Sequence, residues 1–251
     1  MQVADKLVLI TGGASGLGYA AAQVMLAAGA RVALFDRDAE RVAQAAQTLG
    51  ANASAYAVDV IDAAAVATAI DRLGPLHALL NCAGIGPASR TLGRQGPMPL
   101  DLFERVLQIN LVGSFNVARL AAAVMARNEP DAEGERGVIV HTASVAAFEG
   151  QIGQVAYAAS KGGIVAMTLP MARDLAGLGI RVNAIAPGIF DTPLMQAASE
   201  EVRQPLIAAT QFPKRLGEPQ EFGELALHIL ENRFLNASVL RLDGGLRMPP
   251  R

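Results

Sequence analysis

Seven short apolar stretches alternate with longer alanine-rich segments along this chain, and this alternation constrains the fold more than any other feature. The apolar stretches are rich in valine, isoleucine and leucine and cover residues 6–11, 31–36, 54–59, 77–82, 137–144, 180–187 and 238–244. Helical periodicity occupies the segments near residues 16–28, 38–49, 62–73, 99–127, 154–177 and 219–232. Strands that are apolar throughout are buried on both faces, and the intervening helices supply that cover. We therefore expect an α/β fold, a Rossmann-type doubly wound parallel sheet of seven strands with helices on both faces.

Residues 1–251 are expected to form a single domain, because no repeat and no shift in composition divides them. Segments 84–99 and 128–137 are rich in glycine, proline and charged residues, which is typical of surface loops. A third segment, 188–217, follows the sixth apolar stretch and mixes helical pieces with prolines. Because ligands bind at the carboxyl ends of parallel strands, we expect segment 188–217 to form a lid over a substrate.

Charge and cysteine content exclude several classes of function. The formal net charge is −2 and no basic block occurs, so neither a nucleic-acid groove nor an anionic membrane surface is expected. Cys82 is the only cysteine and the three histidines lack ligand spacing, so we expect no disulfide and no metal site. The N-terminal apolar run is too short for a signal sequence, and no stretch approaches the roughly 18 apolar residues of a membrane span. We expect a soluble cytoplasmic protein.

A glycine-rich loop, "TGGASGLG", follows the first apolar stretch and precedes the first helical segment. Its glycines stand at positions 12, 16 and 18, a spacing of T-G-x-x-x-G-x-G that differs from the common G-x-G-x-x-G. A tight turn alone could require such glycines for backbone reasons. Between a strand and a helix, however, the loop lets the backbone approach a pyrophosphate at the helix N-terminus. The sequence therefore predicts a dinucleotide cofactor.

Acidic and polar residues at the next strand ends refine this prediction. Asp36 ends the second stretch, and a carboxylate there accepts hydrogen bonds from ribose hydroxyls and repels a 2′-phosphate, which favours NAD over NADP. Arg37 follows it and could either meet a phosphate or be a solvated residue at a strand end. Asp59 and Val60 close the third stretch and residues 81–84 the fourth, where an adenine ring and its ribose would lie. Alternatively, Asp59 caps the following helix.

The pair Tyr157 and Lys161 predicts acid–base chemistry. Residues i and i+4 share one face of a helix, so the ammonium lies one turn beyond the phenol. With an oxidised nicotinamide, the ammonium would stabilise the phenolate, and lowering its pKa from about 10 to about 7 requires about 4 kcal/mol. Tyr157 would then act as general base towards a hydroxyl that is being oxidised. By spacing alone, an exposed Tyr–Lys pair on an amphipathic helix is the better interpretation.

Two further polar residues favour the chemical interpretation. Ser144 ends the fifth stretch, 13 residues before Tyr157, and its hydroxyl could orient the substrate oxygen. Asn110 lies between Ile109 and Leu111 in the middle of the long fourth helix, and it could hold a water chain linked to Lys161. Alternatively, Asn110 bends or caps that helix.

These motifs together resemble the short-chain dehydrogenase/reductase family over the whole chain: "TGGASGLG", "NCAG", Asn110, Ser144, "YAASK" and "PG" at 187–188. Longer stretches such as "ENRFLNASVLRLDGGLRM" are similar to its branch of type-2 3-hydroxyacyl-CoA dehydrogenases. The resemblance implies a homotetramer, NAD as cofactor, and a catalytic tetrad of Asn110, Ser144, Tyr157 and Lys161. Cys82 departs from the family's more frequent N-N-A-G, a departure that this branch shares.

The resemblance also implies two sets of binding residues. The substrate would contact Ser144, Gln154 and Tyr157. The cofactor set consists of Gly12, Ser15, Gly16, Leu17, Gly18, Asp36, Asp59, Val60, Asn81, Ala83, Gly84, Tyr157, Lys161, Pro187, Gly188, Ile189 and Thr192.

The expected reaction is the NAD-dependent, reversible oxidation of a 3-hydroxyacyl-CoA to a 3-ketoacyl-CoA. A hydroxysteroid or other secondary-alcohol dehydrogenase, a 3-ketoacyl-carrier-protein reductase and a non-catalytic nucleotide-binding scaffold are the alternatives. Apolar side chains of the lid suit a short or branched acyl chain, or else pack within the lid and core; they are Ile189, Phe190, Leu194, Met195, Leu206, Ile207 and Phe212.

Overall fold

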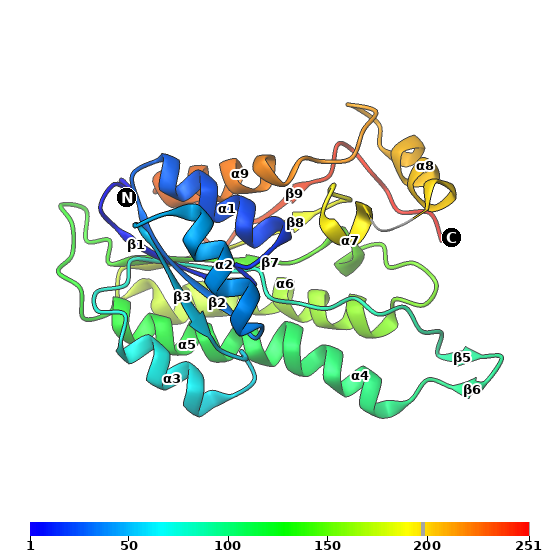
Figure 1. The fold of residues 1–251 in the computed structure, drawn as a ribbon, viewed down its shortest axis with the longest axis horizontal. Helices are drawn as coiled ribbons and strands as arrows, with labels where there is room; N and C mark the ends of the chain where they lie inside the picture. Colours follow the sequence, from blue (N-terminus) through cyan, green and yellow to red (C-terminus); the bar gives the residue numbers. More distant parts are fainter. Residues whose placement is uncertain (197–198, 251) are drawn as a thin grey trace.

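A seven-stranded parallel sheet forms the centre of the computed structural model, which describes residues 1–196 and 199–250 (Figure 1). The strand order is β3-β2-β1-β4-β7-β8-β9, and every neighbouring pair is parallel. The strands are β1 (Leu7–Thr11), β2 (Arg31–Asp36), β3 (Ala53–Ala57), β4 (Ala78–Asn81), β7 (Gly137–Thr142), β8 (Ile180–Pro187) and β9 (Val239–Leu242). The predicted doubly wound sheet is confirmed, and its order reverses between β1 and β4, where such sheets bind ligands.

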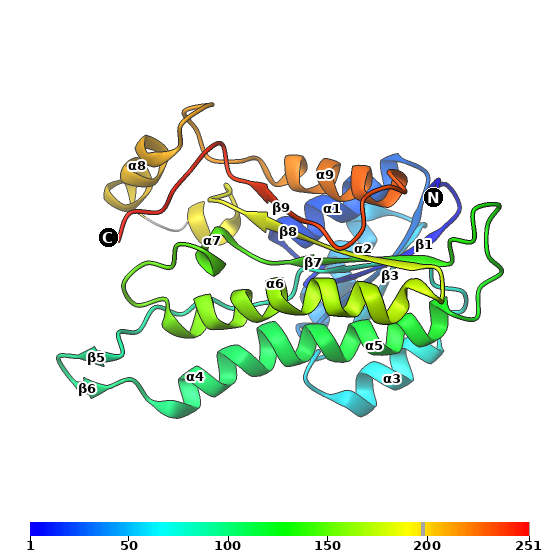
Figure 2. The ribbon, with the colours of Figure 1, turned by 180° about the vertical axis from the view of Figure 1, so that it is seen from behind.

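Helices cover both faces of this sheet, as Figures 1 and 2 show from opposite sides. One face carries α1 (Gly16–Ala27), α2 (Ala39–Leu49) and α9 (Pro219–Glu231). The other carries α3 (Ala63–Asp71), α5 (Ser114–Met125) and α6 (Val155–Ala176), with α4 (Leu100–Leu107) extending the line of α5.

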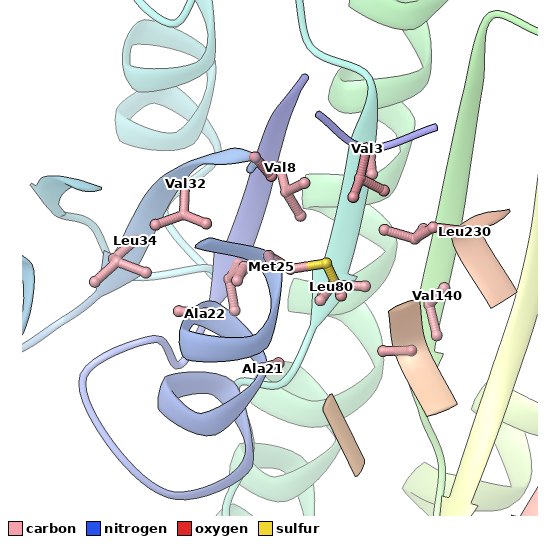
Figure 3. Close-up of a cluster of buried hydrophobic side chains, with 14 of the residues drawn as sticks. Val3, Val8, Ala21, Ala22, Met25, Val32, Leu34, Leu80, Val140 and Leu230 are labelled. Carbon is pink, nitrogen blue, oxygen red and sulfur yellow. The ribbon is translucent and has the colours of Figure 1, made fainter. Parts of the chain in front are cut away.

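Two hydrophobic cores result from the alternation of side chains along each strand. Val8 and Leu80 point to the α1 side, where Figure 3 shows them beside Met25. Leu9 and Leu79 point to the opposite side and pack below α5. Because both faces of the central strands β1, β4, β7 and β8 are covered, these strands are buried at nearly every position, which is why the sequence pattern predicts them well.

Four predicted strands extend past the observed strand end, by two residues in β3, β7 and β9 and by one in β4. β3 ends at Ala57, so Asp59 follows the strand and accepts a hydrogen bond from the Ile61 amide (3.2 Å). The cap of α3 is Asp62, which accepts from the Ala64 and Ala65 amides, so the capping role considered for Asp59 is wrong. The first amides of a helix have no partner within the helix. The short carboxylate of Asp62 accepts hydrogen bonds from them, so the chain leaves the sheet before α3 begins.

Ser144 lies beyond the end of its strand for the same reason. β7 ends at Thr142, and Ser144 caps a short 3₁₀ turn, Val145–Ala147, by accepting from the Ala146 amide (3.1 Å). The prediction that Ser144 belongs to the strand is therefore wrong by two residues, although it still lies at the carboxyl edge of the sheet.

The predicted loop and lid both contain regular structure. Segment 84–99 holds a small antiparallel hairpin of β5 (Leu92–Gly93) and β6 (Gly96–Pro97), which projects from the body of the protein in Figure 2. The lid holds α7 (Pro193–Gln196) and α8 (Glu200–Ala209). β5, β6 and α7 are poorly predicted from periodicity, because two to four residues show no repeat.

The long fourth helix is continuous from Leu100 to Met125 but changes its winding at Gln108–Gly113, a π-helical segment that contains Asn110. By length and mean hydropathy this helical run of 26 residues could span a membrane. Half of its most apolar window is buried within the protein, however, as expected of a core helix packed on a sheet.

A buried histidine lies in the middle of the sheet. His141 on β7 is fully enclosed, and its Nδ1 atom lies 3.1 Å from the Asn81 amide nitrogen. Its Nε2 atom has no partner among the described residues. Burial, with a smaller contribution from the charge of Lys161, lowers the pKa of His141 to about 3. The imidazole therefore stays neutral in the folded protein.

We expect His141→Asn to make the protein less sensitive to acid. Below pH 6.5 the unfolded chain protonates this imidazole while the folded protein does not, so stability falls with pH until about pH 3. Between pH 7 and pH 5 the loss of unfolding free energy should be about 2 kcal/mol smaller in the variant. Urea denaturation at both pH values measures this difference. His228→Asn, on the exposed side of α9, is the control, and identical slopes for wild type and His141→Asn would contradict the expectation.

Candidate active site

The glycine loop forms a tight cradle at the switch point of the sheet. Gly12 has a φ of +64°, and a Cβ atom there would lie 2.9 Å from the main chain of Ala83. A Cβ atom at Gly18 would collide with the carbonyl oxygen of Gly12. The first turn of α1 contains no acidic residue, and the side chain of Ser15 makes no capping bond. The loop thus leaves a helix N-terminus open to an anion, which fits the pyrophosphate of a dinucleotide.

Thr11 joins this loop to the end of β4 and was not singled out by the sequence analysis. Its hydroxyl accepts from the amides of Cys82 and Ala83, both at 3.1 Å, and donates to Asn81 Oδ1 at 3.3 Å. A threonine immediately before Gly12 is the only sequence signal for this role. The side chain of Asn81 is turned inwards, where its amide also donates to the carbonyl of Ser114, so only its main chain could face a ligand.

The remaining predicted cofactor residues border the same edge of the sheet. Asp36 accepts weakly from the amides of Ala14 and Asp38, both at 3.3 Å, which holds its carboxylate beside the glycine loop. Thr192 of the lid lies over that loop, since a Cβ atom on Gly16 would stand 3.7 Å from its methyl group. Val60 is buried and packs against Gly113, and Asp59 stands in the exposed turn before it.

The turn after β8 completes this edge. Pro187 ends the strand, and Gly188 donates its amide to Leu242 of β9 (2.9 Å). A Cβ atom at Gly188 would approach within 2.9 Å of Asp243, so the turn is pressed against the chain that leaves β9. Ile189 follows and lines a hollow of about 180 Å³ below the lid.

Lys161 is buried at the centre of the predicted catalytic group. Its ammonium donates to the carbonyl of Thr142 (2.6 Å) and lies 5.8 Å from the centre of the Tyr157 ring. Burial lowers the pKa of Lys161 to about 8, because a charged ammonium loses hydration in this position. The amine is therefore still mainly protonated at neutral pH.

Tyr157 and Ser144 interact as expected, but the acidity of Tyr157 is not lowered. Burial raises the pKa of Tyr157, and the hydrogen bond from Ser144 offsets this only in part. The expected effect of Lys161 on the pKa of the phenol applies to the site with an oxidised nicotinamide bound, and it stays a prediction. In the structure, loss of hydration is the main cause of the raised pKa of Tyr157.

Asn110 ties two parts of the site together. Its Oδ1 atom accepts from the amide of Ile85 (2.8 Å), and its amide donates to the carbonyl of Ile85 (2.9 Å) and to the hydroxyl of Ser160 (3.0 Å). Ser160 in turn donates to the carbonyl of Tyr157 (2.7 Å). Both amide hydrogens of Asn110 are thus in use, so the predicted water chain to Lys161 would have to start from Oδ1 or from the main chain. The side chain positions α6.

A hollow of about 450 Å³ opens beside the start of α6. Gln154, predicted to contact the substrate, stands in its wall and accepts from the amide of Gln151 (3.0 Å). The other lining residues come from the hairpin segment and from the turn before α6, and include Arg90, Leu92, Ile152 and Ala158. Ala158 lies on α6, one residue after Tyr157.

The apolar residues of the lid divide into different environments. Phe190 is buried in the α1-side core and packs on Gly217, so it belongs to the core and not to a substrate pocket. Phe212 is 83% exposed. Met195, Leu206 and Ile207 are half-buried, whereas the side chain of Leu194 lies outside the described part of the structure.

Known proteins resemble this chain over its whole length. The short chain dehydrogenase family profile matches residues 6–203. A 3-hydroxyacyl-CoA dehydrogenase type-2 from Homo sapiens is 50% identical and is aligned over 99% of this chain and 98% of its own length. The protein of that name from Drosophila melanogaster is 48% identical over 99% of this chain and 100% of its own.

Solved structures agree with this relationship. The crystal structure of 3-hydroxyacyl-CoA dehydrogenase type-2 from Mycobacterium avium superposes with a TM-score of 0.93 and 42% identity, covering 98% of this chain and 97% of its own. The 3-oxoacyl-[acyl-carrier protein] reductase from Brucella melitensis has a TM-score of 0.89 and 33% identity, covering 99% and 93%. The chain therefore belongs to the short chain dehydrogenase family and is an oxidoreductase that uses a nicotinamide cofactor.

Proposed function

We propose that this protein catalyses the reversible, NAD-dependent oxidation of 3-hydroxyacyl-CoA to 3-ketoacyl-CoA. The observation that carries the proposal is full-length identity of about half to several proteins named 3-hydroxyacyl-CoA dehydrogenase type-2. The cluster of Ser144, Tyr157 and Lys161 supports it, because a protein that only binds a nucleotide has no need of a buried lysine beside a phenol.

The residues of the site have separate roles in this reaction. When bound, the nicotinamide accepts the hydride from the carbinol carbon. Ser144 holds the substrate hydroxyl, and Tyr157 takes its proton. Lys161 favours the phenolate through its charge, and Asn110 fixes the start of α6 through Ser160. The lid, with Thr192 over the glycine loop, would keep water from the reacting atoms.

Reduction of acetoacetyl-CoA with NADH, followed at 340 nm, tests the proposal. We expect its kcat/KM to exceed that of any steroid ketone, because a modest hollow next to the turn that carries Gln154 suits a short acyl chain whose nucleotide stays outside. A steroid that outperforms every acyl-CoA of four to eight carbons would favour the alternative of a hydroxysteroid or other secondary-alcohol dehydrogenase.

A 3-ketoacyl-carrier-protein reductase is the second candidate, supported by the similar Brucella melitensis structure. Such an enzyme would accept a carrier-protein thioester in preference to the same acyl group on CoA. Comparing the two thioesters at equal concentration distinguishes the two functions.

Cofactor choice should depend on Asp36. Its carboxylate ends β2 beside the glycine loop and would repel a 2′-phosphate, so we expect NAD to be preferred over NADP by more than tenfold in kcat/KM. Asp36→Ala should narrow that preference, and Arg37→Ala serves as the neighbouring control. Equal use of both cofactors by the wild type would contradict this assignment and point to Arg37 as the dominant group.

We further propose a homotetramer. Large apolar side chains are exposed along the outer faces of α4, α5 and α6 and of the π segment between α4 and α5: Leu100, Val112, Phe115, Val155 and Leu169. A continuous apolar surface of this kind is costly in water and is typical of a subunit interface, and closed symmetry then favours a tetramer. Sedimentation at micromolar protein tests this proposal; a monomer would contradict it.

A further inference from the structure

The last residues of the chain return to the catalytic edge of the sheet and contact the turn that precedes α6. We call this turn, residues 148–154, the substrate turn, because it contains Gln154 and connects the 3₁₀ turn capped by Ser144 to α6, which carries Tyr157; it also forms one wall of the hollow of about 450 Å³. The C-terminal tail, residues 243–250, follows β9 and runs towards it (Figure 2). Tail and turn are almost 100 residues apart in sequence, so no local pattern links them.

Arg241, the third residue of β9, lies just before the tail and makes the strongest contact between this end of the chain and the substrate turn. Its Nη atoms donate to both carboxylate oxygens of Glu149 (2.8 and 3.0 Å), and its Nε atom donates to Asp243 (2.7 Å). The ring of Phe148 lies 5.4 Å below the guanidinium carbon. A hydrogen bond from Arg241 lowers the pKa of Glu149, so this carboxylate stays charged. Planar two-point recognition of this kind fixes direction as well as distance.

The tail holds the substrate turn at a second place. The side-chain amide of Gln151 donates to the carbonyl of Pro249 (3.0 Å), and the main-chain amide of Ile152 donates to Pro250 (3.1 Å). These carbonyls stand on prolines, whose fixed φ limits their movement. The turn is therefore held at Glu149 and again two to three residues later.

The tail also contacts the other side of the site. Asp243 lies against Gly188 in the turn after β8, and the carbonyl of Gly244 accepts from the amides of Gln211 and Phe212 at the end of the lid. One short segment thus contacts the substrate turn, the turn after β8 and the base of the lid. A displacement of Arg241 would therefore affect the substrate turn, the turn after β8 and the base of the lid.

We propose that Arg241 is a positioning residue: through Glu149 it holds the substrate turn in the conformation that receives the acyl thioester. The proposal rests on the proposed acyl-CoA activity. Arg241 does not contact the reacting atoms, so its removal should weaken substrate binding while leaving the proton transfer unchanged.

A purely stabilising role would give a different result. The side chains of Arg241 and Glu149 are 24% and 26% exposed, and ion pairs near the surface contribute little to folding. The substrate turn, in contrast, has no strand partner and depends on these contacts for its position. The pair should therefore affect the turn much more than the fold.

The test is a double-mutant cycle of Arg241→Gln and Glu149→Gln. We expect each single variant to raise the KM for acetoacetyl-CoA about tenfold, with kcat and the Kd for NADH changed less than about twofold. The effects of the two substitutions should be clearly less than additive, because both remove the Arg241–Glu149 contact, although Arg241 also contacts Asp243 and Glu149 also pairs with Arg247. Arg233→Gln is the matched control: this arginine is 35% exposed and pairs with Asp131 and Glu133, far from the substrate turn.

Hydrogen exchange gives a readout that does not depend on the substrate. The amide of Ile152 should exchange at least about tenfold faster in Arg241→Gln and in a chain ending at Met248, with the amides of β7 unchanged. If Arg241→Gln does not fold, Glu149→Gln decides the matter, because it removes the same ion pair from the other side. If acetoacetyl-CoA is not turned over at all, the proposed function fails, yet the exchange measurement still judges the role of Arg241.

Three results would overturn the proposal. They are an unchanged KM in the folded variants, an equal rise in KM in Arg233→Gln, and additive effects in the double variant. Unchanged exchange at Ile152 would overturn it as well.

Discussion

Tyr157→Phe is expected to lower kcat by at least about 100-fold while folding and NAD binding survive, which is the scale of general acid–base catalysis. The substitution removes one oxygen and keeps the ring, which lies 3.5 Å from the position that a Cβ atom on Gly86 would take. Ser144 would lose its partner, and the substrate hydroxyl would have no group to take its proton. Burial raises the pKa of Tyr157, so the structure favours the neutral phenol.

Steady-state kinetics and NADH fluorescence titration measure both parts of this expectation. Tyr56→Phe is a suitable control, because Tyr56 lies on β3 against Phe35, away from the catalytic edge. Turnover within a few-fold of wild type would show that another group accepts the proton. A parallel loss of NADH affinity would instead indicate a damaged site.

The sheet could be predicted because its strands are buried on both faces. β2 and β8 have the predicted bounds, since both are apolar up to a turn or a proline. Asp59 and Ser144 were placed in strands because a polar residue after an apolar run gives no sign of where pairing stops. Their positions depend on amides that a new helical turn leaves without partners, and sequence periodicity does not record this.

The candidate site was predictable only where its residues are close in sequence. Tyr157 and Lys161 lie one turn apart on a helix, so their spacing is informative. Thr11 and His141 belong to a network that joins different strands, and Arg241 meets Glu149 across 92 residues. Such contacts arise only when the sheet assembles, so neither propensity nor spacing indicates them.

The acidity of the catalytic group also required the structure. From spacing, Lys161 should lower the pKa of Tyr157, because a nearby positive charge favours the phenolate. The structure shows that both groups are buried, and burial has opposite effects on their pKa values: it raises that of the phenol and lowers that of the amine. Burial cannot be derived from an i, i+4 spacing on a helix.

Lys161→Met should lower kcat at pH 7 by about 100-fold, because loss of two pKa units of phenolate stabilisation is worth about 2.7 kcal/mol. Methionine keeps most of the volume of the side chain and removes the charge. It also leaves the carbonyl of Thr142 without its 2.6 Å donor. That loss is offset because the buried ammonium no longer has to be desolvated.

The pH dependence distinguishes an electrostatic role from a structural one. In the variant, Tyr157 must lose its proton without help, so the rate of oxidation should continue to rise with pH where the wild type has levelled off. The folded pKa of Lys161, about 8, lies below its ordinary 10.5, so wild-type stability should rise between these values. Above pH 8 the folded protein gives up this proton before the unfolded chain does. Lys161→Met should lack that rise.

Rates and unfolding free energies between pH 7 and pH 10.5 test both expectations. Lys214→Met is the matched control, since that lysine also donates to main-chain carbonyls, those of Ala208 and Thr210, but is exposed. A rate profile of unchanged shape, lowered equally at every pH, would mean that Lys161 acts only by holding Thr142 in place. Groups other than this ammonium would then stabilise the phenolate.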